Sequence, residues 1–337
     1  MEESSNSLAG FLFKTLLIII LFIGILFLLY LIYTIYINVP REPQNLDVIM
    51  NNASTIGLSE NSSFLKVSQF HPNMKFNHNS LSYSIDMNCP EEKRQRMIEA
   101  FNYLSGEVPV ISFYETSSNA NIEVTCSEIE KPTIETDAPK DFFIAGEGGA
   151  KEIIQAGKYN IITNGTISLY QSPHGAIKCD FPNVEVHELI HVFGFDHSSD
   201  KKSLMNPLLN SCDQTLDSSI IKELNRLYSE PNLPDLYFED MKVVKKGRYI
   251  DFNVSIKNIG TISAENINLF VLEDGKIIEE KQIEEISFGA GLMLRVENLK
   301  LNSLNPKEIR FVIDKDNLIK ELDKKNNLAI VNMTRSN

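Results

Sequence analysis

Three histidines and one glutamate lie between His187 and His197 of this 337-residue sequence. His187 and His191 are four residues apart, so on an α-helix they share one face and can hold a single metal ion between them. Glu188 is rotated from His187 by about 100°, which directs its carboxylate toward a water on that ion and places it as a general base. Gly194 lets the chain turn sharply after the helix, so His197 can return as a third ligand. These spacings predict a zinc centre with a fourth position left for water.

A methionine in a predicted turn follows this motif. It lies in the sequence Ser203-Leu204-Met205-Asn206-Pro207, directly before a proline. Together the motif and the methionine resemble the metzincins, and the spacing of the methionine is most similar to the matrixin branch. The resemblance covers about residues 72–230 and is specific only from 187 to 207. It implies roles for five residues: zinc ligands His187, His191 and His197, base and acid Glu188, and hydrophobic floor Met205.

The sequence departs from many matrixins in two ways. It has no cysteine-switch segment of the Pro-Arg-Cys-Gly type, so latency of that kind receives no support. It also lacks a His-x-Asp cluster for a second, structural zinc, because His71, His78 and His174 are scattered. We therefore expect one catalytic zinc. Nothing in the sequence supports calcium sites, although the family resemblance leaves them open.

The elements that must position this motif are predicted from apolar periodicity. Residues 81–87 alternate like a half-buried strand, and Asn88 and Pro90 follow as a helix cap and a first-turn residue. The helix ends at Gly106, and strands are expected near 110–115 and 121–126. The order strand, helix, strands predicts an α+β domain with a twisted mixed sheet.

Two further elements flank the motif. Residues 163–166 (Thr-Asn-Gly-Thr) predict a turn between two strands, the second being 167–170. If the metzincin resemblance holds, an edge strand near here pairs with an extended substrate. After the motif, Asp217 is a predicted helix cap. The apolar stripe of this last helix is predicted to pack in the core and contains Ile220, Ile221, Leu224 and Leu227.

The four cysteines form no Cys-x-x-Cys pair, which argues against a thiolate metal site or a redox motif. Three disulfide pairings are possible, and four free thiols are the alternative. We favour Cys179 with Cys212, which bracket the histidine motif. Cys89 with Cys126, each at the end of a predicted strand, is then the second pair.

Composition restricts the class of protein. The chain is 43% hydrophobic and 23% charged, as in globular proteins, and its length suits about two domains. A formal net charge of -13 argues against a nucleic-acid-binding surface.

Residues 15–37 contain no charged side chain and are rich in Leu, Ile and Phe. As a helix they span about 35 Å, enough to cross a bilayer. A cleaved signal peptide is the rival interpretation, but its apolar region is shorter and residues 38–41 offer no small-x-small cleavage site. We expect a tail at 1–14, an uncleaved transmembrane helix at 15–37 and a stalk at 38–71. The numbers of lysines and arginines on the two sides of this helix do not determine its orientation in the membrane. The predicted disulfides and the protease interpretation favour placing most of the chain on the extracytoplasmic side.

The C-terminal third has a different pattern. Pro231 and Pro234 mark a boundary, and residues 250–257 then alternate strictly between apolar and polar side chains. Asp274-Gly275 predicts a hairpin, and strand-like runs recur to Asn332, enough for about seven strands of an immunoglobulin-like sandwich at 231–337. The stretches 258–261 and 314–327 resemble the CARDB module. That resemblance implies a role in binding a protein or cell-surface ligand, or in spacing, rather than in catalysis.

Two functions are compatible with these features; a third, a zinc exopeptidase, would need a charged anchor for a substrate terminus, and no residue identifies one. The favoured one is a membrane-anchored zinc endopeptidase that cleaves extracytoplasmic protein or peptide substrates, with Glu188 transferring the protons. The alternative is an adhesion or scaffold protein whose metzincin domain is catalytically unused. Glu188 favours the enzyme, because a structural zinc site is closed by four protein ligands and has no use for a base.

Overall fold

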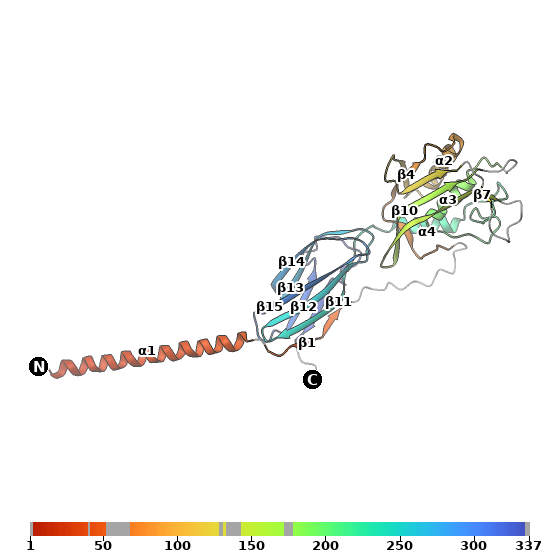
Figure 1. Ribbon diagram of the computed structural model, residues 1–337. Coiled ribbons are helices and arrows are strands. Elements are labelled where there is room, and N and C mark those ends of the chain that lie inside the picture. The colour runs from red at the N-terminus through yellow and green to blue at the C-terminus, as the bar shows by residue number, and fades with distance from the viewer. Residues whose placement is uncertain are drawn as a thin grey trace.

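The computed structural model describes residues 3–39, 41–51, 68–127, 131–132, 143–171 and 178–333. Figure 1 shows three parts in a row, a long helix, a β-sandwich and an α/β region. This architecture confirms the predicted fold class of an N-terminal apolar helix, a mixed α/β domain and a C-terminal all-β sandwich.

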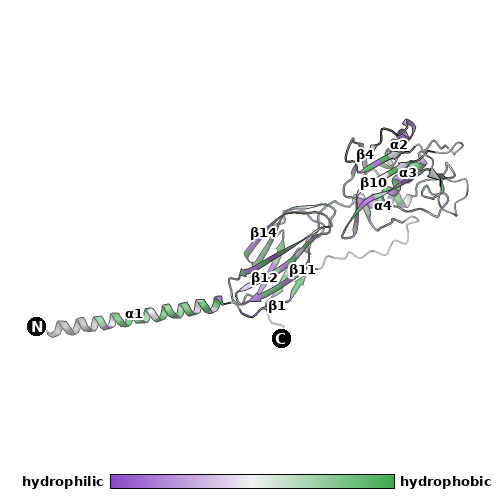
Figure 2. Ribbon diagram, in the orientation of Figure 1, coloured by the Kyte–Doolittle hydropathy of each residue, from purple (hydrophilic) through white to green (hydrophobic). Residues whose placement is uncertain are grey.

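The N-terminal helix, α1, runs from Glu3 to Asn38. Its segment Phe13–Asn38 is long and apolar enough to cross a bilayer, and none of its most apolar stretch is covered by the other residues that the structure describes. Most of the ribbon of this segment has the colour of hydrophobic residues in Figure 2. A helix that is apolar all round, with no protein packed on it, fits a lipid environment.

The α/β region is built on a six-stranded sheet in the order β3-β10-β6-β4-β5, with β9 added along β10. All pairings are parallel except that of β9, which runs antiparallel to β10. A separate hairpin is formed by β7 (Lys131–Pro132) and β8 (Phe143–Ile144). The strands of the main sheet are β3 (Met74–Phe76), β4 (Ser80–Ile85), β5 (Ser112–Glu115), β6 (Ile122–Cys126), β9 (Gly146–Ala156) and β10 (Tyr159–Leu169).

Three helices complete this region, and all three match predicted helices. Their bounds are α2 (Glu91–Glu107), α3 (Asn183–Val192) and α4 (Ser218–Ser229). The predicted stripe of α4 is buried except Ile221, which is partly covered. Pro90, not Asn88, is the N-cap of α2, and no side chain caps that helix end. The first turn instead receives the negative charge of Glu91 and Glu92, which the helix dipole favours.

The turn predicted at residues 163–166 is wrong, because β10 continues through it with only a bulge at Asn164. Gly165 serves a different purpose from turning the chain. A Cβ atom at this position would lie 2.4 Å from Cγ1 of Val192 in α3. The glycine therefore lets α3 approach the sheet, and the edge strand expected near 167–170 is β9 instead.

The C-terminal sandwich consists of two antiparallel sheets, ordered β1-β11-β12-β15 and β14-β13-β16-β17-β2. The alternation predicted at 250–257 is confirmed, since Ile250, Phe252, Val254 and Ile256 are buried in its core. Among the described residues after 231 the sandwich has seven strands, the predicted number. They are β11 (Leu236–Lys246), β12 (Tyr249–Asn258), β13 (Ala264–Glu273), β14 (Lys276–Ile286), β15 (Gly291–Lys300), β16 (Glu308–Ile313) and β17 (Leu328–Asn332).

Two more strands of the sandwich come from the other end of the chain. β1 (Gln44–Leu46) pairs with β11, and β2 (Val48–Met50) pairs with β17. The stalk predicted for 38–71 is therefore wrong for residues 44–50. Each strand is only three residues long, so its stability comes from the sheet that it joins rather than from local sequence.

The sandwich contacts the α/β region through the turn between β9 and β10. A Cβ atom on Gly157 in this turn would lie 2.8 Å from the carbonyl oxygen of Ile259, so the two surfaces are tightly apposed. The chain joining the two regions is also held, because Thr261 N–H donates to Leu233 O at 2.9 Å. An apolar cluster spans the junction and contains Ala156, Tyr159, Ile161, Phe288 and Leu322.

Two buried carboxyl groups make the stability of the sandwich depend on pH. Burial raises the pKa of Asp235 to about 6 and that of Glu321 to about 7. The folded sandwich thus keeps protons that the unfolded chain releases near pH 4, and its stability falls as the pH rises from about 4 through 7. We expect hydrogen exchange in β16 and β17, corrected for the intrinsic rate, to be faster at about pH 8 than at about pH 5.5. Glu321→Gln should shrink this difference, and an unchanged difference would contradict the assignment.

Candidate functional site

Helix α3 carries His187, Glu188 and His191 on a scaffold that is buried almost throughout. Its apolar side chains Val186, Leu189, Ile190 and Val192 fill the core of the α/β region.

The helix stops at a glycine that no other residue can replace without strain. Gly194 has φ +83°, and a Cβ atom there would lie 2.4 Å from Sδ of Met74. This is the sharp turn that the sequence predicted, and it returns the chain toward α3.

The three histidines, predicted from sequence as ligands, come together at the end of this turn. Nε2 of His191 lies 3.0 Å from Nε2 of His187 and 3.2 Å from Nε2 of His197. Among the described residues, these three form the one cluster of His, Cys, Asp or Glu side chains that could hold a metal ion.

The tautomers of two imidazoles follow from their backbone partners. His187 Nδ1 lies 2.7 Å from the carbonyl oxygen of Leu204, and His191 Nδ1 lies 2.7 Å from that of Phe195. A carbonyl only accepts, so each Nδ1 carries the proton and each Nε2 presents a lone pair. Two lone pairs 3.0 Å apart repel each other unless a cation lies between them.

These nitrogens fit zinc. Two ligands at 2.0–2.1 Å in a tetrahedral site are separated by about 3.3 Å, close to the observed 3.0 and 3.2 Å. Burial lowers the pKa of His187 to about 3, and it also lowers the pKa values of His191 and His197. The imidazoles are therefore neutral at physiological pH, the form that binds a metal.

Glu188 lies beneath strand β9. A Cβ atom on Gly146 would lie 2.7 Å from Cγ of Glu188, and one on Gly148 would lie 2.1 Å from its carbonyl oxygen. Burial raises the pKa of Glu188 to about 8, although a hydrogen bond from the Gly148 backbone opposes the shift. A nearby divalent cation would lower this pKa again, so the carboxylate can be ionised when metal is bound.

The segment around Met205 supports the site through its backbone. Met205 is fully buried, and its carbonyl accepts from Ser198 N at 2.7 Å. The neighbouring Leu204 carbonyl is the one that orients His187. Ser203 links this segment to α4, because its hydroxyl donates to the carboxylate of Asp217. Asp217 is the N-cap residue of α4, as predicted, but its carboxylate accepts from Ser203 and makes no capping hydrogen bond to the described residues of the helix.

The structure contains both favoured disulfides, Cys89–Cys126 and Cys179–Cys212. The second joins the chain before α3 to the chain after Met205, so it encloses the whole histidine motif. In the chain-entropy model, loops of this length contribute about 3–4 kcal/mol each. Such bonds persist in oxidising compartments.

Arg96 of α2 was not singled out from the sequence, yet it fastens the entry to α3. Its guanidinium donates to the carbonyl oxygens of Cys179 at 2.9 Å and Phe181 at 3.1 Å. It also pairs with Glu185 at 3.1 Å. Arg96 is partly buried, but the apolar pattern of the helix does not distinguish this arginine from a solvated one.

A second element missed from the sequence, residues 68–70, braces the turn after α3. Phe70 N–H donates to Gly194 O at 2.8 Å, and Asp196 N–H donates to Ser68 O at 2.9 Å. The Gln69 amide donates to Phe193 O at 3.0 Å and exchanges two further bonds with the Met74 backbone. This bracing holds Phe195, whose carbonyl orients His191, so Gln69 is a positioning residue.

Replacing Gln69 should therefore weaken metal binding without touching a ligand. We expect Gln69→Ala to raise the zinc dissociation constant by up to about tenfold, the lower end of the range for groups that orient ligands. Competition with a chelating dye measures it. Gln95→Ala is the control, because Gln95 is exposed and, within the described part of the chain, its side chain hydrogen-bonds to Glu91 of the same helix. Equal zinc affinity in Gln69→Ala and wild type would contradict the role.

Comparisons with known proteins divide the chain as the structure does, into an α/β region and a C-terminal sandwich. Residues 75–229 match the family model described as Matrixin, and residues 233–331 match the model described as CARDB. No curated protein matches. Similar solved structures include the CARDB domain of a Pyrococcus furiosus protein in complex with di-metal ions, 19% identical over 29% of this chain and 85% of that chain, with a TM-score of 0.25.

A solution structure of the same Pyrococcus furiosus domain gives a similar result. It is 20% identical over 30% of this chain and 93% of that chain, again with a TM-score of 0.25. The matched ranges lie on the two folded regions described above, and the apolar helix α1 precedes them. The chain therefore carries an N-terminal apolar helix, a matrixin-family domain of the kind found in zinc metalloproteases, and a CARDB domain.

Proposed function

We propose that this protein is a membrane-anchored, zinc-dependent endopeptidase that cleaves extracytoplasmic proteins. His187, His191 and His197 would bind one zinc ion, and Glu188 would act as general base and then general acid. The observation that carries the proposal is the convergence of three Nε2 atoms, each within 3.2 Å of another. Two of them belong to buried histidines on α3, the helix that also holds Glu188.

The proposed chemistry divides between the metal and the protein. Bound zinc supplies a Lewis acid that polarises the scissile carbonyl and acidifies the attacking water. Glu188 accepts the proton of that water and later gives it to the departing amine. The Leu204 and Phe195 carbonyls hold the imidazoles in the required tautomer. The proposed reaction therefore requires neutral imidazoles as metal ligands and an ionised Glu188 carboxylate as proton acceptor.

Strand β9 is the proposed substrate-binding edge. Within the described part of the chain it pairs with β10 on one side and with no strand on the other. Its glycines Gly146 and Gly148 lie against Glu188, so a peptide added to this edge would pass close to the proton-transfer group. Backbone pairing of this type recognises extended segments with little dependence on their side chains.

The proposed location rests on two observations. Helix α1 has a segment of membrane-spanning length and apolarity, and the α/β region holds two disulfides. Disulfides are rare in reducing compartments. Together they support a single-pass anchor with the matrixin and CARDB domains on the extracytoplasmic side.

A role in adhesion or scaffolding is the second candidate, and the CARDB domain is the reason to test it. Peptide-library hydrolysis by the intact protein in detergent decides between them. We expect cleavage in the interior of peptides, loss of activity with a zinc chelator, and recovery on adding about one zinc per chain. Hydrolysis that is indifferent to chelation, or no hydrolysis by zinc-loaded protein, would reject the endopeptidase.

A further inference from the structure

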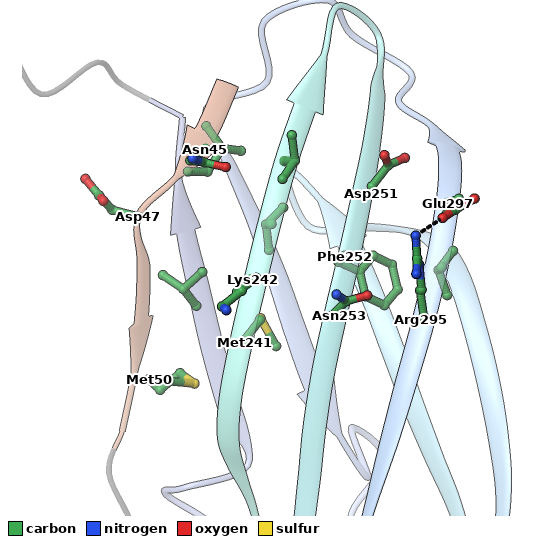
Figure 3. Close-up of a pocket in the computed structure, with 15 residues that line it drawn as sticks. Asn45, Asp47, Met50, Met241, Lys242, Asp251, Phe252, Asn253, Arg295 and Glu297 are labelled. Atoms are coloured by element: carbon green, nitrogen blue, oxygen red, sulfur yellow. Dashed lines mark hydrogen bonds and ion pairs between the residues drawn. The ribbon is translucent and has the colours of Figure 1, made fainter. Parts of the chain in front are cut away.

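The segment that follows α1 is bound into the sandwich along both of its sheets. Residues 44–46 pair with Val243–Lys245 of β11, and residues 48–50 pair with residues 329–331 of β17. The chain crosses from one sheet to the other at Asp47, which Figure 3 shows between the two short strands. These residues, 44–50, are called the clasp below.

The side chains of the clasp alternate between the core and the solvent. Leu46, Val48 and Met50 pack against the hydrophobic core of the sandwich, whereas Ile49 is 54% exposed. Figure 3 shows Met50 and Asn45 on one side of a cavity of about 630 Å³, with Met241 and Phe252 among the residues opposite. Without the clasp, this flank of the core would open to water.

Contacts at each end extend the clasp. Asn51 donates through its side-chain amide to Lys325 O at 2.6 Å. At the other end, a Cβ atom on Gly247 would lie 3.0 Å from Val39 O and 3.3 Å from Cγ of Arg41. The end of α1 is thereby placed beside the turn between β11 and β12, and Figure 1 shows the sandwich between α1 and the matrixin domain.

This topology places the matrixin domain inside a chain loop that the sandwich closes. The domain lies between β2 and β11 in sequence, and both of these strands belong to the sandwich. We propose that the clasp binds the rest of the protein to α1 independently of the covalent connection through residues 52–67. The chain can then be cut between the clasp and the matrixin domain without separating that domain from its anchor.

Strand addition to a sheet edge is an established mode of peptide binding, in which backbone hydrogen bonds give affinity and alternate side chains give specificity. The clasp has both features. It supplies a backbone ladder to two edges and three apolar side chains to one core. The sandwich is therefore both the receptor for the anchor segment and the spacer between helix and catalytic domain.

The test uses the full chain in detergent, held on a resin through an N-terminal affinity tag. Residues 55–61 are replaced by the recognition sequence of a site-specific protease, and the C-terminal fragment is followed after cutting. We expect it to stay on the resin. Cut protein carrying Val48→Asp and Met50→Asp should release it at least about tenfold faster, a change of about 1.4 kcal/mol in the barrier to release.

Ile49→Asp is the matched control, because this side chain points to solvent and should leave retention unchanged. A synthetic peptide of residues 41–51, in excess, should displace the fragment from cut wild-type protein, and a scrambled peptide should not. The peptide competition does not depend on whether a protein with a substituted clasp folds. Rapid release of the cut wild-type fragment, or retention that neither the peptide nor the double variant affects, would overturn the proposal. Neither outcome depends on zinc or on peptidase activity.

Discussion

Replacing Glu188 with glutamine should lower kcat for peptide hydrolysis by about 10²–10⁴-fold, the contribution of a positioned general base. Glutamine has the shape of the carboxylate but accepts no proton. The buried position already favours a neutral side chain, as the raised pKa of about 8 indicates, so the fold should tolerate the change. The three imidazoles are untouched, as are the carbonyl partners of His187 and His191.

The measurement must separate lost chemistry from lost metal. Zinc content by atomic emission should stay near one per chain, and the melting temperature should change little. Glu92→Gln on the exposed face of α2 serves as control, since the ion pair of its side chain is with the surface residue Lys178. If zinc-loaded Glu188→Gln kept more than about a tenth of the wild-type kcat, another group would have to be the base.

The histidine motif could be predicted from sequence because its geometry is local. Four residues of α-helix place His187 and His191 on one face whatever surrounds them. The turn at Gly194 is also local, since φ of +83° is a property of one residue. The partners that orient these imidazoles are backbone carbonyls of Leu204 and Phe195. Every residue has such a carbonyl, so no residue type could identify them.

The errors share one physical origin, which is tertiary pairing that overrides local sequence. Residues 44–50 resembled a stalk because three-residue strands carry almost no local preference. The two short strands form because β11 and β17, which come from the C-terminal third of the chain, provide sheet edges with which they pair. Asn164-Gly165 resembled a hairpin turn because its residue types are those of a two-residue turn. In the structure, Gly165 instead leaves room for the close approach of Val192 in α3.

Gly148→Ala should be the most damaging single-methyl change at the site, and Gly149→Ala should be nearly harmless. A Cβ atom on Gly148 would lie 2.1 Å from the carbonyl oxygen of Glu188, whereas no atom of the described residues lies within 4 Å of one on Gly149. The obstructing atom is backbone of a buried helix, so β9 must move away from α3 rather than a side chain rotate. Overpacking of this kind costs about 1–3 kcal/mol, and more where the neighbour cannot yield.

The two variants should therefore separate in both stability and activity. Gly148→Ala should lower the melting temperature of the zinc-loaded protein by several degrees and reduce kcat/KM, because the proposed substrate edge no longer lies against Glu188. Gly149→Ala should stay within about 1 kcal/mol of wild type, since it also lowers the entropy of the unfolded chain. Differential scanning calorimetry and peptide hydrolysis measure the pair. Equal behaviour of the two variants would mean that β9 does not contact α3 in solution, and the substrate edge would have to lie elsewhere.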